Sequence, residues 1–354
     1  MKKVGIIIVN YKNYANKFLA ECRESLRAQS YPKELTRIYI IDNASTGETR
    51  RFLAENYPEA AVMPRDDGNY AAANNTGIKK ALQDGRELIV IANMDVKFDR
   101  DWLRELVSAV SAQRSTGIAQ SKILLYPEKD GDRLKINSLG NVIHYLGFGF
   151  TSGYNQPDEE IEGLPEIAGY ASGCSFIIKK EVLEKINGYD EEFYMYHDDM
   201  EISLKVRLAD WKIILAPKSV VYHKYEFSRS VKMLYFMERN RYLVMLIFYR
   251  LPTILLIFPA LVLMDLGMLL YSIPGGWLKT KLAVYRYFLN AKSWKKIISE
   301  RKRVRSLRTI GDRQLINNYK GRVLFQEIDN PVLKYIANPL FNLYWNIVKN
   351  IIFW

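Results

Sequence analysis

The stretch Glu87–Asp95, reading ELIVIANMD, holds the pattern from which the fold can be predicted. Its first six residues are mostly apolar, which is typical of a strand buried on both faces of a parallel sheet. Its last three residues, Asn93, Met94 and Asp95, bring two polar side chains directly after that strand. A buried strand that ends in polar residues indicates a ligand site beyond the carboxyl edge of a sheet.

The same pattern occurs twice earlier in the chain. The run VGIIIVNY at 4–11 and the run RIYIIDN at 37–43 each pass from apolar residues to two polar or aromatic residues. Segments with helical spacing separate these runs, so strands alternate with helices, which predicts an α/β fold with a parallel sheet. We therefore expect three polar clusters to meet at one edge of the sheet.

The remaining elements follow from the same periodicities. Further strands are expected at 61–63, 117–124, 171–178 and 212–216, and helices at 18–28, 46–56, 71–82, 102–110, 180–186 and 202–209. The stretch 127–166 is rich in Gly, Asp, Glu and Pro and is expected to be an excursion on the substrate side. We place a domain boundary between 1–235 and 236–354, where the sequence becomes strongly apolar.

Composition limits the class of protein. The chain has 354 residues, of which 49% are hydrophobic and 25% charged, as in a globular protein with an ample core. Its net charge of +12 suggests a polyanionic partner such as nucleic acid, anionic lipid or a phosphorylated substrate. Two cysteines, Cys22 and Cys174, form no disulfide framework and favour a reducing compartment. The apolar run Val4–Val9 is too short for a signal peptide.

The densest reactive chemistry lies in Phe193–Glu201, which reads FYMYHDDME. Its three acids in four positions repel one another, so they suggest a catalytic base or a cation site. The alternative is a helix start, with Asp198 as the N-cap and Asp199 and Glu201 in the first turn. The two interpretations are compatible, because a helix N-terminus can also hold a base rigidly.

Six segments in this order resemble the inverting family-two glycosyltransferases of the GT-A fold, especially bacterial and archaeal rhamnosyltransferase-like members. The segments are VNYKN (9–13), IIDNAS (40–45), DDGNYAAANNTGI (66–78), NMDV (93–96), GCSFIIKKEVLEKINGYDEEFYMYHDDMEISLKVRLADWKI (173–213) and VVYH (220–223). They cover roughly residues 4–225. The resemblance implies a GT-A type, Rossmann-like domain that binds a nucleotide sugar on a mostly parallel mixed sheet.

The resemblance also implies a donor site and a metal site. The donor-binding residues would be Val9, Asn10, Tyr11, Asp42, Asn43, Gly68, Asn74, Asn93 and Asp95. Asp95 would bind Mn²⁺ or Mg²⁺ together with His223, and the cation would neutralise the diphosphate leaving group. Asn93 stands where the family's Asp-x-Asp motif has its first acid, so it adds no charge to the site.

Each of these residues also has a structural interpretation. Asp95 could cap the helix that follows it, and Gly68 and Asn74 could form only a turn and a helix cap. A lone histidine such as His223 is usually structural. His144 and His197 have no counterpart in the resemblance, and we interpret both as structural.

On the acceptor side, the resemblance assigns the catalytic base to Asp199. Asp198 and Glu201 would support the base and order its loop, and Gly173 and Cys174 would border the acceptor. The family usually shows Glu-Asp-x-Asp where this chain shows Asp-Asp-x-Glu, which leaves the base in register. The expected reaction is a single displacement with inversion, in which Asp199 takes the proton of an acceptor hydroxyl.

The C-terminal region indicates contact with a membrane. Leu251–Ile273 contains 23 residues with one charge, long enough to cross a bilayer, although a buried helix of a soluble protein is the alternative. Pro274–Phe325 holds fourteen Lys and Arg against two acids. One crossing would place this basic segment across the membrane from the N-terminal domain, whereas basic segments stay cytoplasmic. We therefore expect hydrophobic or amphipathic helices in monotopic or re-entrant attachment to the cytoplasmic face of the membrane.

These features together predict the partners. The donor would be a nucleotide-diphosphate sugar, dTDP- or UDP-linked, and the acceptor a lipid-linked glycan held near an anionic membrane surface. The chain lacks the Gln-x-x-Arg-Trp motif of processive synthases, so it would add one or a few sugars in cell-surface glycan synthesis. The alternative is a non-catalytic, membrane-associated protein that binds a nucleotide sugar. Binding of nucleic acid is disfavoured, because the basic residues alternate with membrane-like sequence.

Overall fold

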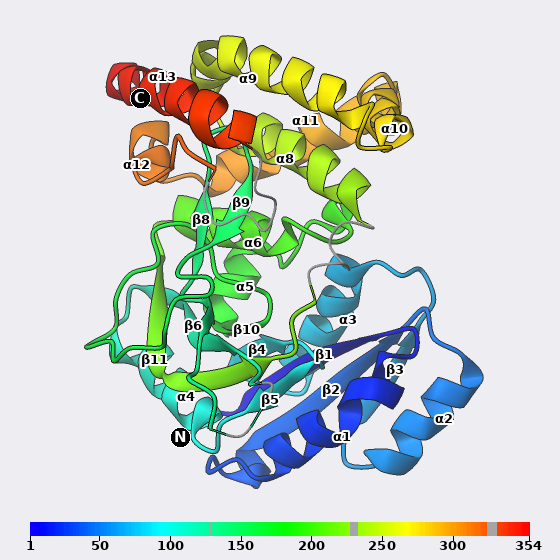
Figure 1. The fold of residues 1–354 in the computed structure, drawn as a ribbon. Helices are drawn as coiled ribbons and strands as arrows, with labels where there is room; N and C mark the ends of the chain where they lie inside the picture. The colour runs from blue at the N-terminus through cyan, green and yellow to red at the C-terminus, as the bar shows by residue number, and fades with distance from the viewer. Residues whose placement is uncertain (128, 130, 227–232, 324–330) are drawn as a thin grey trace. The chain divides into compact units, whose positions relative to one another are not determined.

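The chain folds into two compact units, which are described separately. The structure is a computed structural model that describes residues 1–127, 129, 131–226, 233–323 and 331–354. Unit 1 comprises Met1–Asn141, Thr151–Val206 and Trp211–Tyr225, and unit 2 comprises Val142–Phe150, Arg207–Asp210 and Glu226–Trp354 (Figure 1). Two short segments from before residue 235 thus belong to unit 2. The expected domain boundary at 235–236 stays a prediction, and residues 128 and 130 of the expected excursion lie outside the described residues.

Unit 1 is built on one sheet. Among the described residues, nine strands pair in the order β3-β2-β1-β4-β10-β6-β11-β5, with β7 beside β6. The strands are β1 (Val4–Tyr11), β2 (Thr36–Asn43), β3 (Ala61–Arg65), β4 (Leu88–Ala92), β5 (Val96–Phe98), β6 (Thr116–Leu125), β7 (Ile136–Ser138), β10 (Ser175–Lys179) and β11 (Lys212–His223). Strands β1 to β4 are parallel, β10 is antiparallel to both neighbours, and β6 is parallel to β11. The predicted α/β fold with a mostly parallel mixed sheet is confirmed.

Helices cover both faces of this sheet. They are α1 (Tyr14–Arg27), α2 (Gly47–Asn56), α3 (Tyr70–Gln83), α4 (Trp102–Ala112), α5 (Lys180–Ile186) and α6 (Asp198–Leu208). Apolar residues of α1, α2 and α4 form one core with the face of β1 that carries Ile6 and Ile8 (Figure 1). On the opposite face, α3 packs closely on β1 through Gly77, where a Cβ atom would lie 2.6 Å from a methyl of Ile7. A larger residue at Gly77 would push α3 off the sheet.

Several elements differ from their predicted bounds: helix α1 begins at Tyr14 rather than at 18, helix α6 begins at Asp198 rather than at 202, and three further differences concern strands. The strand expected at 212–216 continues through an irregularity to His223, because Val220 and Val221 again pair with β6. The strand expected at 171–178 begins only at Ser175, because the preceding residues form a turn in which Ser175 N–H bonds to the carbonyl of Ser172. Strand β5 was not predicted, since three residues are too short for a periodicity to show.

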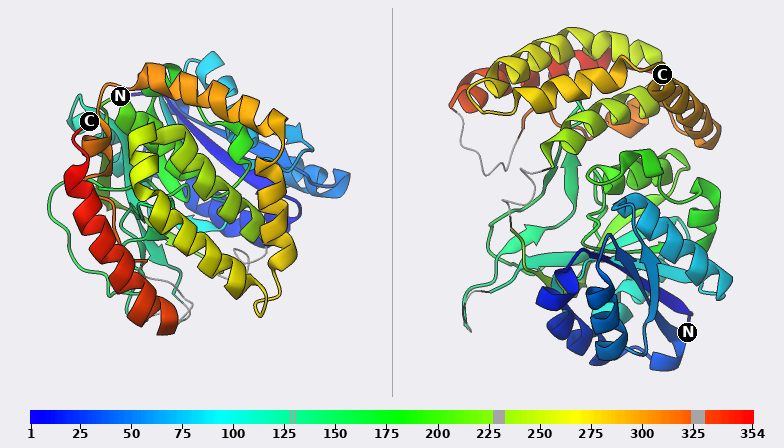
Figure 2. Two further views of the ribbon diagram at one scale, coloured as in Figure 1. Left: turned by 90° about the horizontal axis from the view of Figure 1, so that it is seen from above. Right: turned by 90° about the vertical axis from the view of Figure 1, so that its right-hand side faces the viewer.

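Unit 2 is mainly helical. Its helices are α8 (Leu234–Phe248), α9 (Leu251–Ser272), α10 (Leu278–Phe288), α11 (Ala291–Leu307), α12 (Asp312–Ile316), a π-helical turn η3 (Leu333–Ala337) and α13 (Asn338–Ile351), shown in yellow to red in Figure 2. Strands β8 (Asn141–Ile143) and β9 (Gly149–Thr151) form a separate pair. Among the described residues, α9 is the one helix long and apolar enough to cross a membrane, by length and composition only.

Candidate active site

Asp95 and His223 meet because of the sheet register. Strand β11 runs antiparallel to β5, and this pairing sets His223 opposite Val96, the residue after Asp95. The backbone N–H of Lys224 then bonds to the carbonyl of Asp95 at 2.9 Å. The side chains face each other, with His223 Nε2 3.4 Å from Asp95 Oδ1 and only 11% and 10% of the two side chains exposed. Two residues 128 positions apart, from 95 to 223, therefore form one pair at the end of the strands.

A third residue, Asn137, orients the His223 ring. Asn137 Oδ1 accepts a hydrogen bond from Nδ1 at 2.8 Å, so Nε2 is directed toward Asp95. A histidine that binds a metal commonly gives its second ring N–H to such an acceptor. Burial lowers the pKa of His223, but interactions with Cys174 and Asp95 outweigh burial and raise it to about 10. These interactions favour a positive charge on the His223 ring, and a divalent cation could take the place of the proton on Nε2.

The donor set suits Mn²⁺ or Mg²⁺ held partly by a substrate. One carboxylate oxygen and one imidazole nitrogen are acceptable ligands for Mn²⁺, and Mg²⁺ is commonly held by one or two carboxylates and substrate phosphates. Within the part of the chain that the structure describes, no group of three or more His, Cys, Asp and Glu residues could hold a metal by itself. The pair thus fits a cation that a phosphorylated ligand helps to bind, rather than a structural metal.

The paired acids of Phe193–Glu201 lie at the start of α6, where Asp198 is buried and Asp199 is half-buried. Asp199 Oδ2 accepts from the backbone N–H of Gly173 at 3.2 Å, and its Oδ1 accepts from that of Met200 at 2.8 Å. Burial raises the pKa of Asp199 to about 6. Burial and the neighbouring Asp199 raise the pKa of Asp198 well above its usual range. A carboxyl with a pKa near 6 is mostly ionised at neutral pH and still basic enough to accept a proton.

The backbone before these acids is strained. Tyr194, Tyr196 and His197 have φ angles of +65°, +60° and +59°, in the left-handed region that non-glycine residues rarely adopt. Each such residue costs about 1–3 kcal/mol and persists where the surroundings hold it. The carbonyl of Tyr194 accepts from the N–H groups of Tyr70 and Ala71 at 2.8 and 3.0 Å, which fixes the strained loop to the start of α3. A helix cap alone would not require three strained residues.

Gly173 and Cys174 join the acidic residues to the polar end of β4. The N–H of Gly173 binds Asp199, and the carbonyl of Cys174 accepts from the N–H of Asn93 at 3.0 Å. The predicted acceptor-side turn thus contacts the proposed base directly and the backbone of Asn93, two residues before Asp95.

Tyr70 is a site residue that sequence reasoning missed. Its hydroxyl donates to Asn93 Oδ1 at 3.2 Å, and burial with the nearby Asp198 raises its pKa above the usual range. It therefore lies between the polar end of β4 and the acidic residues of α6. The sequence offered one signal for Tyr70, because it directly follows the helix cap Asn69. Asn69 caps α3 by accepting a hydrogen bond from Ala72 N–H at 3.0 Å.

The predicted donor residues of β1 and β2 form a buried network. Asn10 Nδ2 donates to Asp42 Oδ1 at 2.7 Å, as the register of the two strands requires, and Asn10 Oδ1 accepts from Ala15 N–H at 2.8 Å. Asp42 Oδ2 accepts from Ser45 Oγ at 2.5 Å and from Arg50 Nε at 3.1 Å. Neither side chain is exposed, so contact of Asp42 with a nucleobase stays a prediction that requires local movement.

Asn43 connects β2 to the glycine turn that follows β3. Its Oδ1 accepts from Gly68 N–H at 3.0 Å, and its Nδ2 donates to the carbonyl of Asn69 at 3.1 Å. Gly68 has a φ of +72°, and a Cβ atom there would lie 2.5 Å from the Tyr194 hydroxyl and 3.7 Å from the ring of Tyr11. Glycine is therefore required for this turn to approach the aromatic residues.

Three further predicted site residues also lie inside the protein. Val9 is buried in β1, and Asn74 is fully buried in α3, where its Nδ2 donates to the carbonyl of Tyr70 at 3.1 Å. Glu201 is also fully buried, forms an ion pair with Lys205, and accepts from Asp190 N–H at 3.2 Å. Their assigned roles stay predictions, and for Glu201 the contacts support ordering of the loop rather than contact with an acceptor.

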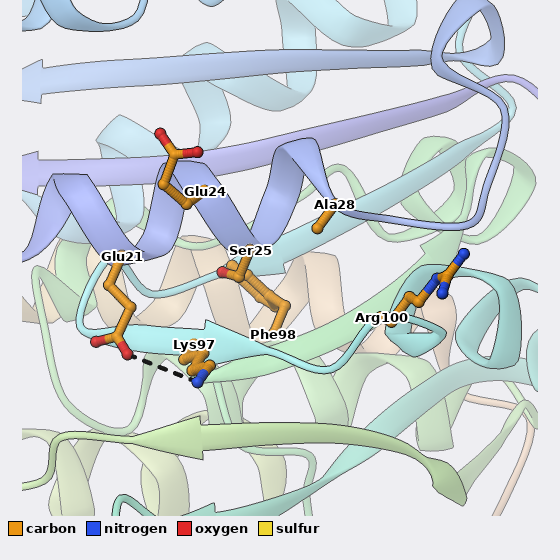
Figure 3. A pocket seen from close by; sticks show the side chains of 7 residues that line it. All are labelled: Glu21, Glu24, Ser25, Ala28, Lys97, Phe98 and Arg100. Carbon is orange, nitrogen blue, oxygen red and sulfur yellow. Dashed lines mark ion pairs between the residues drawn. The ribbon is translucent and has the colours of Figure 1, made fainter.

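Two other features lie away from this set. A pocket of about 570 Å³ beside α1 contains none of the predicted site residues and is lined by Glu21, Glu24, Ser25, Ala28, Lys97, Phe98 and Arg100 (Figure 3). His144 belongs to unit 2, where burial lowers its pKa to about 3. A neutral, enclosed imidazole suits a structural role.

The fold and this site define an α/β protein whose acidic residues, histidine and amides gather at the carboxyl ends of its strands. Residues 5–186, half of the chain, match the family described as "Glycosyl transferase family 2", and the chain belongs to this family. The predicted membership is thereby confirmed. The match ends before Phe193–Glu201 and His223, so the roles of those residues rest on the geometry above.

Two curated relatives have informative names. O-antigen biosynthesis protein RfbC of Myxococcus xanthus is 28% identical over 235 residues, which is 63% of this chain and 17% of the relative. N-acetylglucosaminyl-diphospho-decaprenol L-rhamnosyltransferase of Mycobacterium tuberculosis is 23% identical over 206 residues, which is 52% of this chain and 66% of the relative. The chain therefore spans about a sixth of the first relative and just under two thirds of the second.

A solved structure supports the fold. The crystal structure of GalNAc-T7 with UDP, GalNAc and Mn²⁺ superimposes with a TM-score of 0.52 at 16% sequence identity. The similarity covers 64% of this chain and 44% of that protein. At this identity the likeness concerns the fold, which agrees with the predicted GT-A type.

Proposed function

We propose that this protein is a metal-dependent inverting glycosyltransferase that moves a sugar from a nucleotide-diphosphate sugar to a lipid-linked glycan. The observation that carries the proposal is the arrangement around Gly173 and Cys174. One side of this turn binds the Asp199 carboxyl, whose pKa is about 6, and the other binds the backbone N–H of Asn93, two residues before Asp95, which pairs with His223. A base and a cation site joined by one rigid turn suit a displacement in which an acceptor loses a proton while a diphosphate departs.

Asp199 would act as the general base. The acceptor hydroxyl attacks the anomeric carbon, its proton passes to a carboxylate oxygen of Asp199, and the bond from that carbon to the diphosphate oxygen breaks. Attack from the side opposite the leaving group inverts the configuration. The Gly173 N–H would hold the carboxylate toward the turn, and burial keeps the pKa of Asp199 above its usual value. Positioned general bases contribute about 10²–10⁴-fold to rates.

Asp95 and His223 would hold Mn²⁺ or Mg²⁺, and a bound cation would neutralise charge on the departing nucleoside diphosphate. Asn137 supports this role by presenting Nε2 of His223 toward Asp95. Asn93, held by Tyr70, would contact the donor beside the cation. The GalNAc-T7 structure with UDP and Mn²⁺ is consistent with this part of the proposal.

The donor would be UDP- or dTDP-linked, and transfer would be non-processive. The relative named N-acetylglucosaminyl-diphospho-decaprenol L-rhamnosyltransferase and the relative named O-antigen biosynthesis protein support a lipid-linked acceptor in cell-surface glycan synthesis. The apolar α9 supports attachment to the membrane, which we place on the cytoplasmic face.

The test is the Asp199→Asn variant. We expect transfer to be abolished while calorimetric binding of the donor with Mn²⁺ survives, because the amide keeps the shape of the carboxylate and loses only its basicity. The donor is chosen from UDP-, dTDP- and GDP-sugars by protection against thermal unfolding. Asp210→Asn, at an exposed turn, is the matched control and should keep normal turnover.

Two outcomes would contradict the proposal. Near-normal turnover of Asp199→Asn would show that another group is the base. Donor binding without transfer or donor hydrolysis by the unaltered protein, over a panel of lipid-linked and soluble acceptors, would favour the non-catalytic binding protein.

A further inference from the structure

Large apolar side chains are exposed almost entirely in unit 2. Apart from Met1, every exposed large apolar residue in the described part of the chain lies between Leu251 and Phe353. Many of them are on α9 and α13, where for example 63% of Leu255 and 62% of Leu343 are exposed. Water-soluble surfaces rarely concentrate such residues, and large apolar patches mark sites of interaction with protein or membrane.

The exposed residues on each helix form a stripe. On α9 the stripe includes Leu255, Phe258, Val262 and Leu266, which follow helical spacing. On α13 it includes Leu343 and Ile347. The two helices lie side by side in Figures 1 and 2, and the Tyr344 hydroxyl of α13 donates to the carbonyl of Leu256 in α9 at 2.6 Å. Together they provide one apolar surface two helices wide.

Polar contacts fix the start of α9 to its own unit. Asp312 of α12 accepts from the N–H of Arg250 at 2.7 Å and from the hydroxyl of Thr253 at 2.6 Å. Asp312 also pairs with Arg308 at 2.8 Å. The indole N–H of Trp354, at the end of the chain, donates to Thr253 at 2.9 Å. The first turn of α9 therefore lies against charged groups.

A second set of polar contacts fixes α9 through Asp265. Lys281 Nζ of α10 lies 2.6 Å from Asp265 and 2.7 Å from Glu238 of α8, and Arg241 lies 2.8 Å from Glu238. The hydroxyl of Tyr285 also donates to Asp265 at 2.6 Å. Lys281 and Arg241 are fully buried, so this network is an internal part of unit 2.

These contacts exclude a crossing of the membrane by α9 in this fold. At 1.5 Å a residue, the 22 residues of α9 are about 33 Å long, which would suffice for a hydrocarbon core of about 30 Å. However, α9 is bound to charged partners at its start and again at Asp265. A crossing helix would either break these contacts or draw Asp312, Asp265, Lys281 and Glu238 into hydrocarbon, where charged groups are strongly disfavoured.

The charge beside α9 is positive. Exposed lysines and arginines on α10 and α11 include Lys279, Arg286, Lys292, Lys295, Lys302 and Arg305. The acids of 274–323, Glu300 and Asp312, already pair with Arg303 and Arg308. Exposed apolar residues such as Trp294 and Ile298 lie among these cations. This mixture of cations and apolar residues suits the headgroup region of an anionic bilayer.

We infer that α9 and α13 form an in-plane membrane-binding surface that inserts its apolar stripes into one leaflet, while the cations of α10 and α11 bind anionic headgroups. Helix α9 lies along the bilayer and does not cross it. The inference refines the membrane attachment in the proposed function, and it commits to a lipid surface as the partner because cations and apolar side chains occur together around α9.

The first experiment measures co-flotation of the full chain with vesicles. Phosphatidylcholine vesicles with phosphatidylglycerol should bind the protein, and pure phosphatidylcholine should bind it at least about tenfold less. The double variant Phe258→Asp with Leu343→Asp should reduce binding by at least about tenfold, since each change places a charge in the stripe. Asn346→Asp, which adds a charge on α13 without removing an apolar residue, should bind normally. Equal binding of the double variant and the unaltered protein would overturn the surface assignment.

The second experiment tests the orientation of α9. Single cysteines are placed near its two ends, as Pro252→Cys and Pro274→Cys, in protein bound to preformed vesicles. The two native cysteines are buried, so the labelling of the unaltered protein measures the background reaction with maleimide. A membrane-impermeant maleimide added outside should label both ends at similar rates, before and after detergent. Protection of one end until detergent is added would overturn the in-plane arrangement.

The inference rests on the membrane attachment in the proposed function, but its tests can be separated from the proposed chemistry. Transfer to a water-soluble acceptor, measured without vesicles in the same variants, tests the chemistry of unit 1. Normal transfer with failed flotation by the unaltered protein would overturn only the membrane surface. Flotation without any transfer would overturn only the proposed function.

Discussion

The two units bury charged groups in opposite ways. In unit 1, Asp198 is buried and the neighbouring Asp199 is half-buried, neither forms an ion pair with another described residue, and their pKa values rise. In unit 2, Glu238 is buried against Arg241 and Lys281, and despite burial these cations hold its pKa below the usual value. Charge is left unbalanced in the first case and compensated in the second.

This difference suggests different roles for the two sets of charged residues, a chemical role in unit 1 and a structural role in unit 2. A carboxyl that is buried without a counter-charge costs stability, and such carboxyls cluster at functional sites, which supports the role that we propose for Asp199. A paired buried carboxyl costs little more than the ordering of its partners and fixes helices in one arrangement. The surfaces differ as well, since Met1 is the only large apolar residue exposed in the described part of unit 1, whereas unit 2 exposes many on α9 and α13.

The largest expected effect comes from breaking the compensated charges of unit 2. Lys281→Met leaves Glu238 and Asp265 without their shared cation, and we expect a loss of about 3–5 kcal/mol in the free energy of unfolding. Urea unfolding followed by circular dichroism measures this loss. Lys279→Met on the same helix removes an exposed charge and should change stability by less than about 0.5 kcal/mol. Similar losses in both variants would refute the structural role of the buried network.

A smaller effect is expected from the proposed metal pair in unit 1. Asp95→Ala should lower the transfer rate by at least about a hundredfold, because charge stabilisation by a metal is worth several kcal/mol and about 1.4 kcal/mol is tenfold. Asn137→Ala should weaken Mn²⁺ binding by about 10–100-fold, since it only orients His223. Titration of the rate with Mn²⁺ measures both. Flotation should not change in either variant, and an Mn²⁺-independent rate in the unaltered protein would contradict the assignment.

The smallest expected effect is the dependence of the transfer rate and of stability on pH through the ionisation of Asp199. The rate should fall about tenfold for each pH unit below a pKa of about 6, because Asp199 must be ionised to act as a base. The folded carboxyl binds its proton more tightly than the unfolded one, whose pKa is about 3.9. Stability should therefore decrease as pH rises from about 4 to 6 and stay lower above this window.

The control for this prediction is Asp199→Asn, which removes the buried charge. At pH 7 the variant should melt at a higher temperature, by about 2–4 °C for each kcal/mol of relieved cost. A transfer rate that falls only below about pH 4, or a melting temperature that does not change in the variant, would show that Asp199 is solvated like an ordinary surface carboxyl.

Local sequence patterns were enough to predict the parallel half of the sheet. The apolar runs at 4–9, 37–41 and 87–92 are strands β1, β2 and β4, because continuous burial on both faces leaves a clear signature. The antiparallel position of β10 and the three-residue β5 could not be predicted, since strand order and short pairings depend on contacts distant in sequence. The acidic stretch does begin a helix, but Asp198 is a residue of its first turn, with Asp199 and Glu201, rather than the predicted N-cap.

Site residues that belong to a family motif could be predicted from the sequence. Residues that reach the site only through contacts distant in sequence could not. Asp95 and His223 were expected to pair, and the register of β5 and β11 brings them together. Tyr70 and Asn137 were missed, because each acts on a residue far along the chain, Asn93 and His223. The strain at Tyr194, Tyr196 and His197 had no signal either, since none is a glycine or an asparagine.

The interleaving of the two units limits how such chains can be recombined. Val142–Phe150 folds with the helices of unit 2, where Tyr145 stacks on Trp345 at a centroid distance of 4.7 Å and Arg241 lies 4.6 Å from the ring centre of Phe148. Exchange of residues 226–354 alone for the helices of another transferase would leave this segment without its partners. A chimera that folds must therefore exchange two stretches that are separate in the sequence, Val142–Phe150 and 226–354. Exchange of the C-terminal helices alone would not be enough.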